Sequence, residues 1–198
     1  MEQEPLSGTE SLQIIQEMIQ KARNQFSENG HLYLFWGWVI LICSIGQFVL
    51  QHILHTPHYY YIWGLTWVAA IYQFYYLFKR RKHEKVKTYA DSIVGYVWLG
   101  FIVTMFLSFL AIGSTNDVGH FYRMYAPILL ALYGIPTFLS GIILKVKPLA
   151  IGGVCCWLLS VISNWVSPDY HMILLGLAVI IAWIVPGYFL KKRYKEQH

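Results

Sequence analysis

Four histidines are the residues of this sequence whose type and placement suit chemistry best. His52 and His55 lie one helical turn apart before Pro57, and His120 and His171 begin two later apolar segments. Neutral imidazole is a good ligand for zinc, iron, copper and nickel. If these segments meet at one end of a bundle, the four rings predict a site for a transition metal or a haem. The other interpretation makes them polar or pH-responsive residues at helix ends.

Known metal motifs do not support the first interpretation, so we predict no cofactor and keep a transition metal or haem as an alternative. The sequence contains no HxxxH or HExxH run, and its three cysteines, Cys43, Cys155 and Cys156, all lie within apolar segments. Such cysteines usually act as small apolar residues. Whether the histidines form a metal site or are ordinary polar residues depends on where the segments that contain them lie.

The composition indicates a membrane protein. The 198 residues are 57% hydrophobic and only 13% charged, whereas soluble domains contain about 25% charged residues. Six stretches without Asp, Glu, Lys or Arg have the roughly 17–25 residues that a helix needs to cross a bilayer. They cover residues 32–50, 59–78, 93–113, 124–144, 149–166 and 172–190. We therefore predict an all-α fold, a bundle of six transmembrane helices in three hairpins.

The distribution of basic residues predicts the orientation of this bundle. Of the 15 Lys and Arg residues, only Arg123 falls in a connection on the second side of the membrane. The others lie before the first span, in the 79–87 loop, around Lys145 and after the last span. Cytoplasmic connections carry the excess of Lys and Arg, so we predict that both termini are cytoplasmic. The net charge of +5 reflects this bias and does not indicate nucleic-acid binding.

An amphipathic helix is predicted ahead of the membrane, which divides the chain into residues 1–30 and the bundle of residues 31–198. Leu12, Ile15, Ile19 and Phe26 recur at helical spacing, with glutamines and charged residues between them. This face can lie on lipid, pack under the bundle or dock a partner. With Arg80, Arg81 and Lys82 of the basic loop, it is the predicted partner or lipid contact.

The spans themselves offer little for catalysis or for ion coupling. They contain Ser, Thr, Gln and Asn but no charged residue, whereas proton-coupled carriers need intramembrane charges. No nucleophile motif, phosphate loop or carboxylate pair is present, so we predict that the chain is not an enzyme. Pro136 and Pro186 are predicted to kink two helices, because proline removes a backbone hydrogen bond. The polar side chains either join helices or line a path.

The run GHLYLFWGWVILI after the amphipathic segment resembles an uncharacterised family of small bacterial inner-membrane proteins. Those proteins pair a cytoplasmic helix with a Trp-Gly-Trp first span. The resemblance implies a bacterial cytoplasmic membrane and brings no catalytic or binding residues.

Three functional hypotheses follow. The leading one is a non-enzymatic bundle that senses, regulates or binds a cytoplasmic partner or a second copy. A channel or facilitator for a small neutral solute and an extracytoplasmic metal- or haem-binding protein are the alternatives.

Overall fold

The described residues form an all-helical structure. The computed structural model describes residues 30–83, 89–114 and 118–197, and within them it contains helices and connecting turns without strands. The elements are α2 (His31–His52), the 3-10 helix η1 (Tyr59–Trp63), α3 (Gly64–His83), α4 (Tyr89–Gly113), α5 (Val118–Ile143), α6 (Lys147–Ser163), the 3-10 helix η2 (Pro168–Tyr170), α7 (His171–Val179), the π-helix η3 (Ile180–Ile184) and α8 (Val185–Gln197). The predicted segment 1–30 lies outside the described residues except for Gly30.

Four of these helical stretches are long and apolar enough to cross a membrane. They are His31–His52, Ser92–Gly113, Arg123–Ile143 and Pro168–Glu196. The helix α6 is apolar but shorter, and α3 contains tyrosines, a glutamine and basic residues in its last turns. The helical bundle is thus confirmed, while the crossing of the membrane by all six helices stays a prediction.

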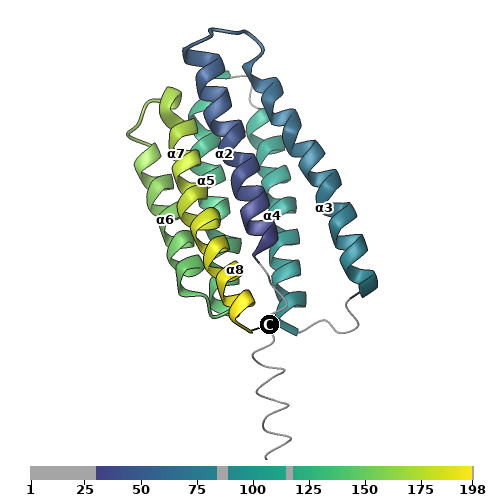
Figure 1. Cartoon of the computed structure of the whole chain (residues 1–198). Helices are drawn as coiled ribbons and strands as arrows, with labels where there is room; N and C mark the ends of the chain where they lie inside the picture. The colour runs from purple at the N-terminus through teal and green to yellow at the C-terminus, as the bar shows by residue number, and fades with distance from the viewer. Residues whose placement is uncertain (1–29, 84–88, 115–117, 198) are drawn as a thin grey trace, which may run out of the picture.

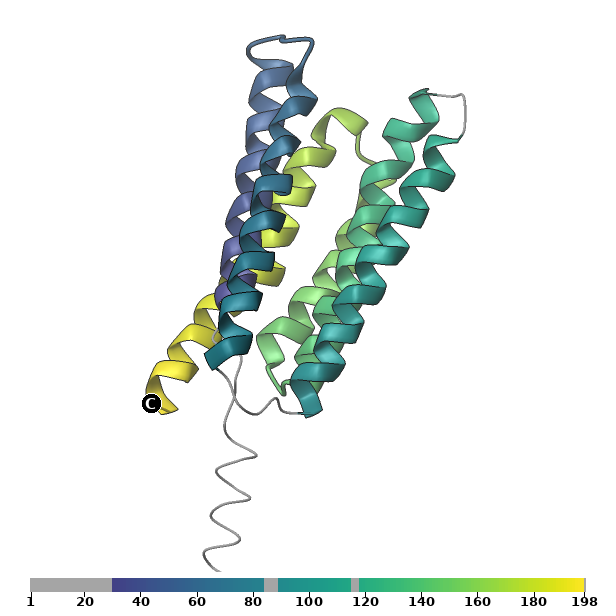
Figure 2. The same ribbon diagram turned by 90° about the vertical axis from the view of Figure 1, so that its right-hand side faces the viewer.

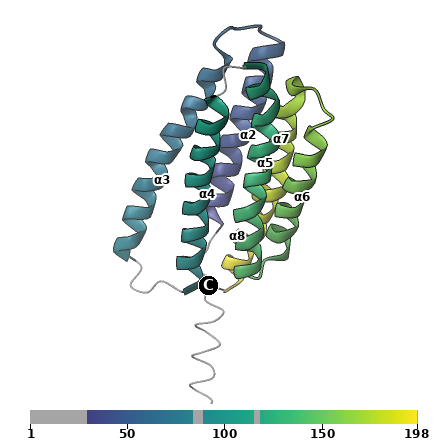
Figure 3. The same cartoon turned by 180° about the vertical axis from the view of Figure 1, so that it is seen from behind.

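The helices run up and down in chain order and pack in two groups. Seen from the side, α2 and α3 lie together and α4, α5 and α6 lie together; α7 begins between the two groups, and α8 ends at the lower left, beyond α2 and α3 (Figure 2). The most extensive packing joins α5 to α6, and α2 packs along α7, η3 and α8. From behind, α4 and α5 cover the bundle and α3 stands at its edge (Figure 3).

Glycines explain why α5 and α6 approach so closely. A Cβ on Gly141 of α5 would lie 2.3 Å from the backbone nitrogen of Ala150, and one on Gly153 of α6 would lie 2.6 Å from that of Phe138. Without side chains at these positions, the two backbones come into direct contact, as small residues permit in membrane bundles.

An aromatic cluster fills the centre of the bundle. Trp183 of η3 lies between Trp98 of α4 and Tyr133 of α5, at ring-centroid distances of 5.7 and 4.7 Å. Its indole N–H donates to the Thr137 hydroxyl at 2.9 Å, and this hydroxyl donates to the Tyr133 carbonyl at 2.7 Å. The Trp183 N–H and the Thr137 hydroxyl therefore both have partners, as burial in apolar surroundings requires.

The sixth predicted span, residues 172–190, is divided in the structure into α7, the π-helix η3 and α8. The Val185 N–H donates to the Ile180 carbonyl, five residues earlier, just before the buried Pro186. Proline cannot donate to the carbonyl four residues before it and its ring crowds that carbonyl, so the wider π turn accommodates Pro186. Pro136 is likewise buried inside α5.

The two ends of the bundle differ in charge (Figure 1). One end, called the basic end below, holds Lys79 at the close of α3, Lys145 and Lys147 between α5 and α6, and the basic residues 191–195 of α8. The opposite end, called the histidine end, holds His52, His55, His58, Asp169 and His171. The alternation of helix direction brings basic residues that are far apart in the sequence to one end.

Candidate functional site at the histidine end

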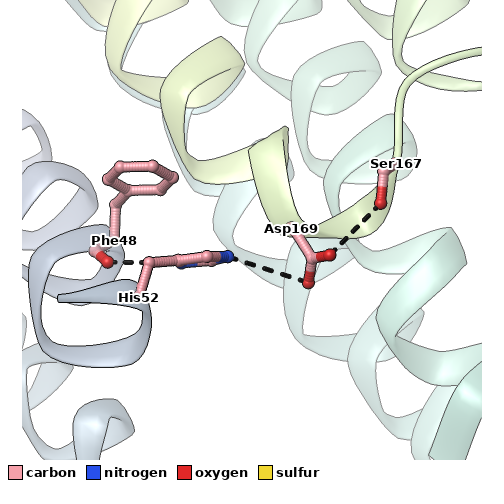
Figure 4. Close-up of polar contacts among 4 residues, drawn as sticks. All are labelled: Phe48, His52, Ser167 and Asp169. Carbon is pink, nitrogen blue, oxygen red and sulfur yellow. Dashed lines mark hydrogen bonds and ion pairs between the residues drawn. The ribbon is translucent and has the colours of Figure 1, made fainter. Parts of the chain in front are cut away.

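His52 joins α2 to the connection that precedes α7. Its Nε2 lies 3.9 Å from Oδ1 of Asp169, and its Nδ1 lies 3.3 Å from the Phe48 carbonyl (Figure 4). The Phe48 ring stacks on the imidazole at 4.6 Å. The Ser167 hydroxyl donates to the other carboxylate oxygen of Asp169 at 3.3 Å. The two ring nitrogens of His52 thus face an acceptor of its own helix and a carboxylate of the connection before α7.

This contact is open to solvent and long. The side chains of His52 and Asp169 are 30% and 60% exposed, and 3.9 Å exceeds hydrogen-bond length. An exposed pair of this kind stabilises a fold by no more than about 1 kcal/mol. Its geometry therefore suits a reversible contact between two helices better than a permanent link.

His171 has a different role, because it is buried at the start of α7. Only 2% of its surface is exposed, and its Nε2 lies 3.0 Å from the Ser163 carbonyl and 3.2 Å from the Val166 carbonyl. The last carbonyls of a helix have no partner within it, so the His171 N–H completes the end of α6. Its Nδ1 is buried without a hydrogen-bond partner among the described residues.

The other two predicted ligands are His55 and His120, and no contact among the described residues joins either of them to His52 or His171. His55 is exposed and has a φ of 47° in the turn after α2. His120 belongs to α5, and its side chain lies outside the described part of the structure. The described residues include no group of three or more His, Cys, Asp or Glu residues that could hold a metal. The four-histidine site remains an untested prediction.

Two tryptophan–glutamine pairs, which the sequence analysis did not predict, tie α3 and η1 to α2. The Trp36 indole N–H donates to the Gln73 side-chain oxygen at 2.6 Å. In the reverse direction, Trp63 of η1 donates to the side-chain oxygen of Gln47 in α2. The signal in the sequence was the rare amide within each apolar segment, which needs a partner when it faces hydrocarbon.

Hydroxyl groups of the apolar segments also bond within the bundle. Ser160 of α6 donates to the Pro127 carbonyl of α5 at 2.6 Å. Thr66 of α3 donates to the carbonyl of Trp63, the last residue of η1, and Thr104 donates to a carbonyl of its own helix. The Trp157 N–H donates to the Ala131 carbonyl at 3.1 Å, close to the position where Pro136 interrupts the ladder of α5. Ser160 and Trp157 thus join α6 to α5, which is the structural alternative to lining a solute path.

No family model, no curated protein and no solved structure matches this chain. The assignment of a function therefore depends on the residues and geometry described above.

Proposed function

We propose that this chain is an integral membrane protein of six spans that acts by binding a partner and contains no catalytic site. The observation that carries the proposal is an interior in which most described polar groups bond to one another, inside an apolar exterior; among the described residues, the buried Ser44 and Ser140 hydroxyls have no hydrogen-bond partner. The buried tryptophans, glutamines and hydroxyls described above bond to other groups of the bundle, whereas large apolar side chains face outward. Trp67 and Phe74 of α3 are 77% and 76% exposed, and Tyr96 of α4 is 73% exposed. Hydrocarbon is a suitable surrounding for such a surface.

The charge difference between the two ends supports an orientation with the basic end in the cytoplasm. Lys145, Lys147 and the basic residues of α8 lie at one end, and Arg123 begins the apolar part of α5 at the other. Basic connections remain on the cytoplasmic side during insertion. In this orientation the segment before α2 also enters from the cytoplasm, and the His52–Asp169 contact faces the opposite compartment.

The proposed contact surface for a protein partner is the apolar face of the N-terminal segment, together with the basic residues at the end of α3. The face comprises Leu12, Ile15, Ile19 and Phe26. Arg80, Arg81 and Lys82, which the sequence pattern assigned to a loop, belong to the last turns of α3. The four face residues and the side chains of the three basic residues lie outside the described part of the structure, so this step rests on the sequence pattern. An amphipathic helix beside a closed bundle suits docking of a partner helix or a second copy.

Cysteine labelling tests the membrane orientation. Single cysteines are introduced as Lys145→Cys and His55→Cys in a variant whose native cysteines are replaced by serine. A maleimide that cannot cross membranes is applied to cells whose outer membrane is permeabilised and whose inner membrane is intact. It should label His55→Cys at once and Lys145→Cys only after lysis. The reverse pattern contradicts the orientation, and release of the protein by alkaline carbonate contradicts membrane insertion.

Two triple variants, one on each face of the N-terminal helix, test the partner surface. Leu12→Ser, Ile15→Ser and Ile19→Ser together should abolish cross-linked homo-oligomers or a captured partner, while the bundle still inserts. The matched control replaces Gln13, Gln16 and Gln20 by serine on the polar face and should leave association unchanged. Equal association in both variants contradicts the proposal. Solute flux through liposomes that contain the purified protein would instead favour the facilitator hypothesis.

A further inference from the structure

A pocket of about 270 Å³ lies at the basic end, where the first turn of α2 meets the last turns of α8. It is lined by His31, Leu34, Lys191, Tyr194 and Lys195. The ionisable lining groups include two ammonium groups and no carboxylate. The pocket belongs to neither the histidine end nor the partner surface proposed above.

Gly30 makes this meeting of helices possible. Its φ is 69°, and a Cβ at this position would lie 2.6 Å from the Gly187 carbonyl oxygen and 2.8 Å from the Leu190 Cβ. A residue with a side chain would therefore push the start of α2 away from α8. Because glycine adopts this backbone conformation without strain, the chain turns into α2 while in contact with the helix that carries Lys191 and Lys195.

The pocket lysines are not neutralised by the described part of the protein. Lys191 and Lys195 are four residues apart and both line the pocket, whereas the neighbouring Lys192 pairs with Glu196 at 4.0 Å. The ion pairs of the described residues include no carboxylate at Lys191 or Lys195. The first turn of α2 also contains no acidic residue, and a helix N-terminus carries partial positive charge. The combined charge of the pocket suits an anion.

An apolar strip leads from this pocket along α2. Leu34 lines the pocket, and Trp38, Ile42 and Ile45 follow it at helical spacing with 46%, 53% and 54% of their surfaces exposed. A soluble anion would use only the charged pocket, whereas an amphiphile would use the pocket and the strip together. The order of cationic pocket and apolar strip matches the order of headgroup and acyl chain in a lipid.

We propose that the pocket binds the phosphate group of an anionic phospholipid, held by Lys191 and Lys195, with an acyl chain along the Trp38 strip. This inference rests on the proposed membrane location. Lysine ammonium groups bind phosphate through charge-assisted hydrogen bonds. A direct contact between an exposed ammonium group and a phosphate contributes up to about fivefold in affinity, so the two lysines together contribute up to roughly twenty-five-fold.

The test uses the full chain in nanodiscs of phosphatidylcholine mixed with phosphatidylglycerol. After transfer to detergent, mass spectrometry measures how much of each lipid stays with the protein. Lys191→Gln with Lys195→Gln removes both direct contacts and should lower the phosphatidylglycerol preference by up to about twenty-five-fold. The control, Lys192→Gln with Arg193→Gln, removes the same charge from the same helix outside the pocket and should keep most of the preference. Lys191→Arg with Lys195→Arg should restore it.

Each other outcome overturns the inference in a distinguishable way. An equal loss in the two neutralised variants means that diffuse charge attracts the lipid, and no loss in either means that the pocket does not bind it. Displacement of phosphatidylglycerol by inorganic phosphate or glycerol 3-phosphate at similar concentration assigns the pocket to a soluble anion. Membrane insertion is scored separately by carbonate extraction, so failure of the membrane proposal is not confused with failure of the lipid site.

Discussion

Replacement of Gly153 by alanine tests the closest helix contact in the bundle. The added Cβ would lie 2.6 Å from the Phe138 nitrogen, 2.7 Å from its Cβ and 2.8 Å from its Cα. Ordinary contact begins at 3.4 Å, so α6 and α5 must separate locally or tilt. Because two of the three opposing atoms are backbone, a change of rotamer cannot relieve the overlap.

The expected cost follows from this overlap. Overpacking of a filled contact costs about 1–3 kcal/mol, while alanine in place of glycine favours a helix by about 1 kcal/mol. The control Gly95→Ala in α4 has the same gain in propensity, but its Cβ meets nothing within 4 Å. The difference in unfolding free energy between the two variants should therefore be about 1–3 kcal/mol.

Thermal unfolding of the purified chain in detergent measures this difference. For a chain of this length, 1 kcal/mol corresponds to about 2–4 °C in Tm. Gly153→Ala should unfold at a lower temperature than Gly95→Ala, and Gly141→Ala should resemble Gly153→Ala. Equal melting temperatures for Gly153→Ala and Gly95→Ala would refute the inference that α5 and α6 touch through their backbones.

Three further changes have defined outcomes. Gln73→Leu removes the acceptor of the Trp36 N–H and should weaken the attachment of α3 by about 0.6–1.7 kcal/mol. Amide hydrogen exchange should then be faster than in the wild type in α3 but not in α5. The same exchange rate of α3 in the variant and the wild type contradicts this. His171→Phe removes the imidazole donor of the Val166 carbonyl and leaves the Ser163 carbonyl with only the Val166 N–H, which should destabilise the fold by about 1–3 kcal/mol. The exposed His58→Phe should change stability by less than about 0.5 kcal/mol, and similar melting temperatures for the two variants argue against the capping role. His52→Gln should cost less than about 1 kcal/mol, because the contact with Asp169 is exposed. Elemental analysis of untagged wild-type protein should find no bound transition metal, and stoichiometric metal that His52→Gln abolishes would establish the histidine site instead.

The helical segments could be predicted from local properties of the sequence. The first predicted span, residues 32–50, corresponds to α2 at His31–His52, and the fifth, residues 149–166, corresponds to α6 at Lys147–Ser163. Runs of apolar residues without charge are sufficient to place a helix, because each such residue contributes independently of its eventual neighbours. The sequence also indicated an irregularity at Pro186, but it did not predict the π turn that accommodates this proline.

The candidate sites were predicted less completely. The sequence singled out the terminal histidines but did not distinguish the exposed His52 from the buried His171, because burial depends on which helix end lies against which. It also gave no reason to pair Trp36 with Gln73 or to place Gly30 against Gly187, since those residues are far apart along the chain.

By itself, the sequence determined that the chain forms apolar helices and that successive helices run in opposite directions, which brings the basic residues to one end. Both properties follow from the order of residues, because the length and charge of each segment are local. Only the tertiary structure decided that α5 packs against α6 through glycines, that His171 completes α6, and that Lys191 and Lys195 share a pocket with the start of α2. These arrangements depend on the complementary shapes of surfaces that the chain brings together only when the whole bundle is packed.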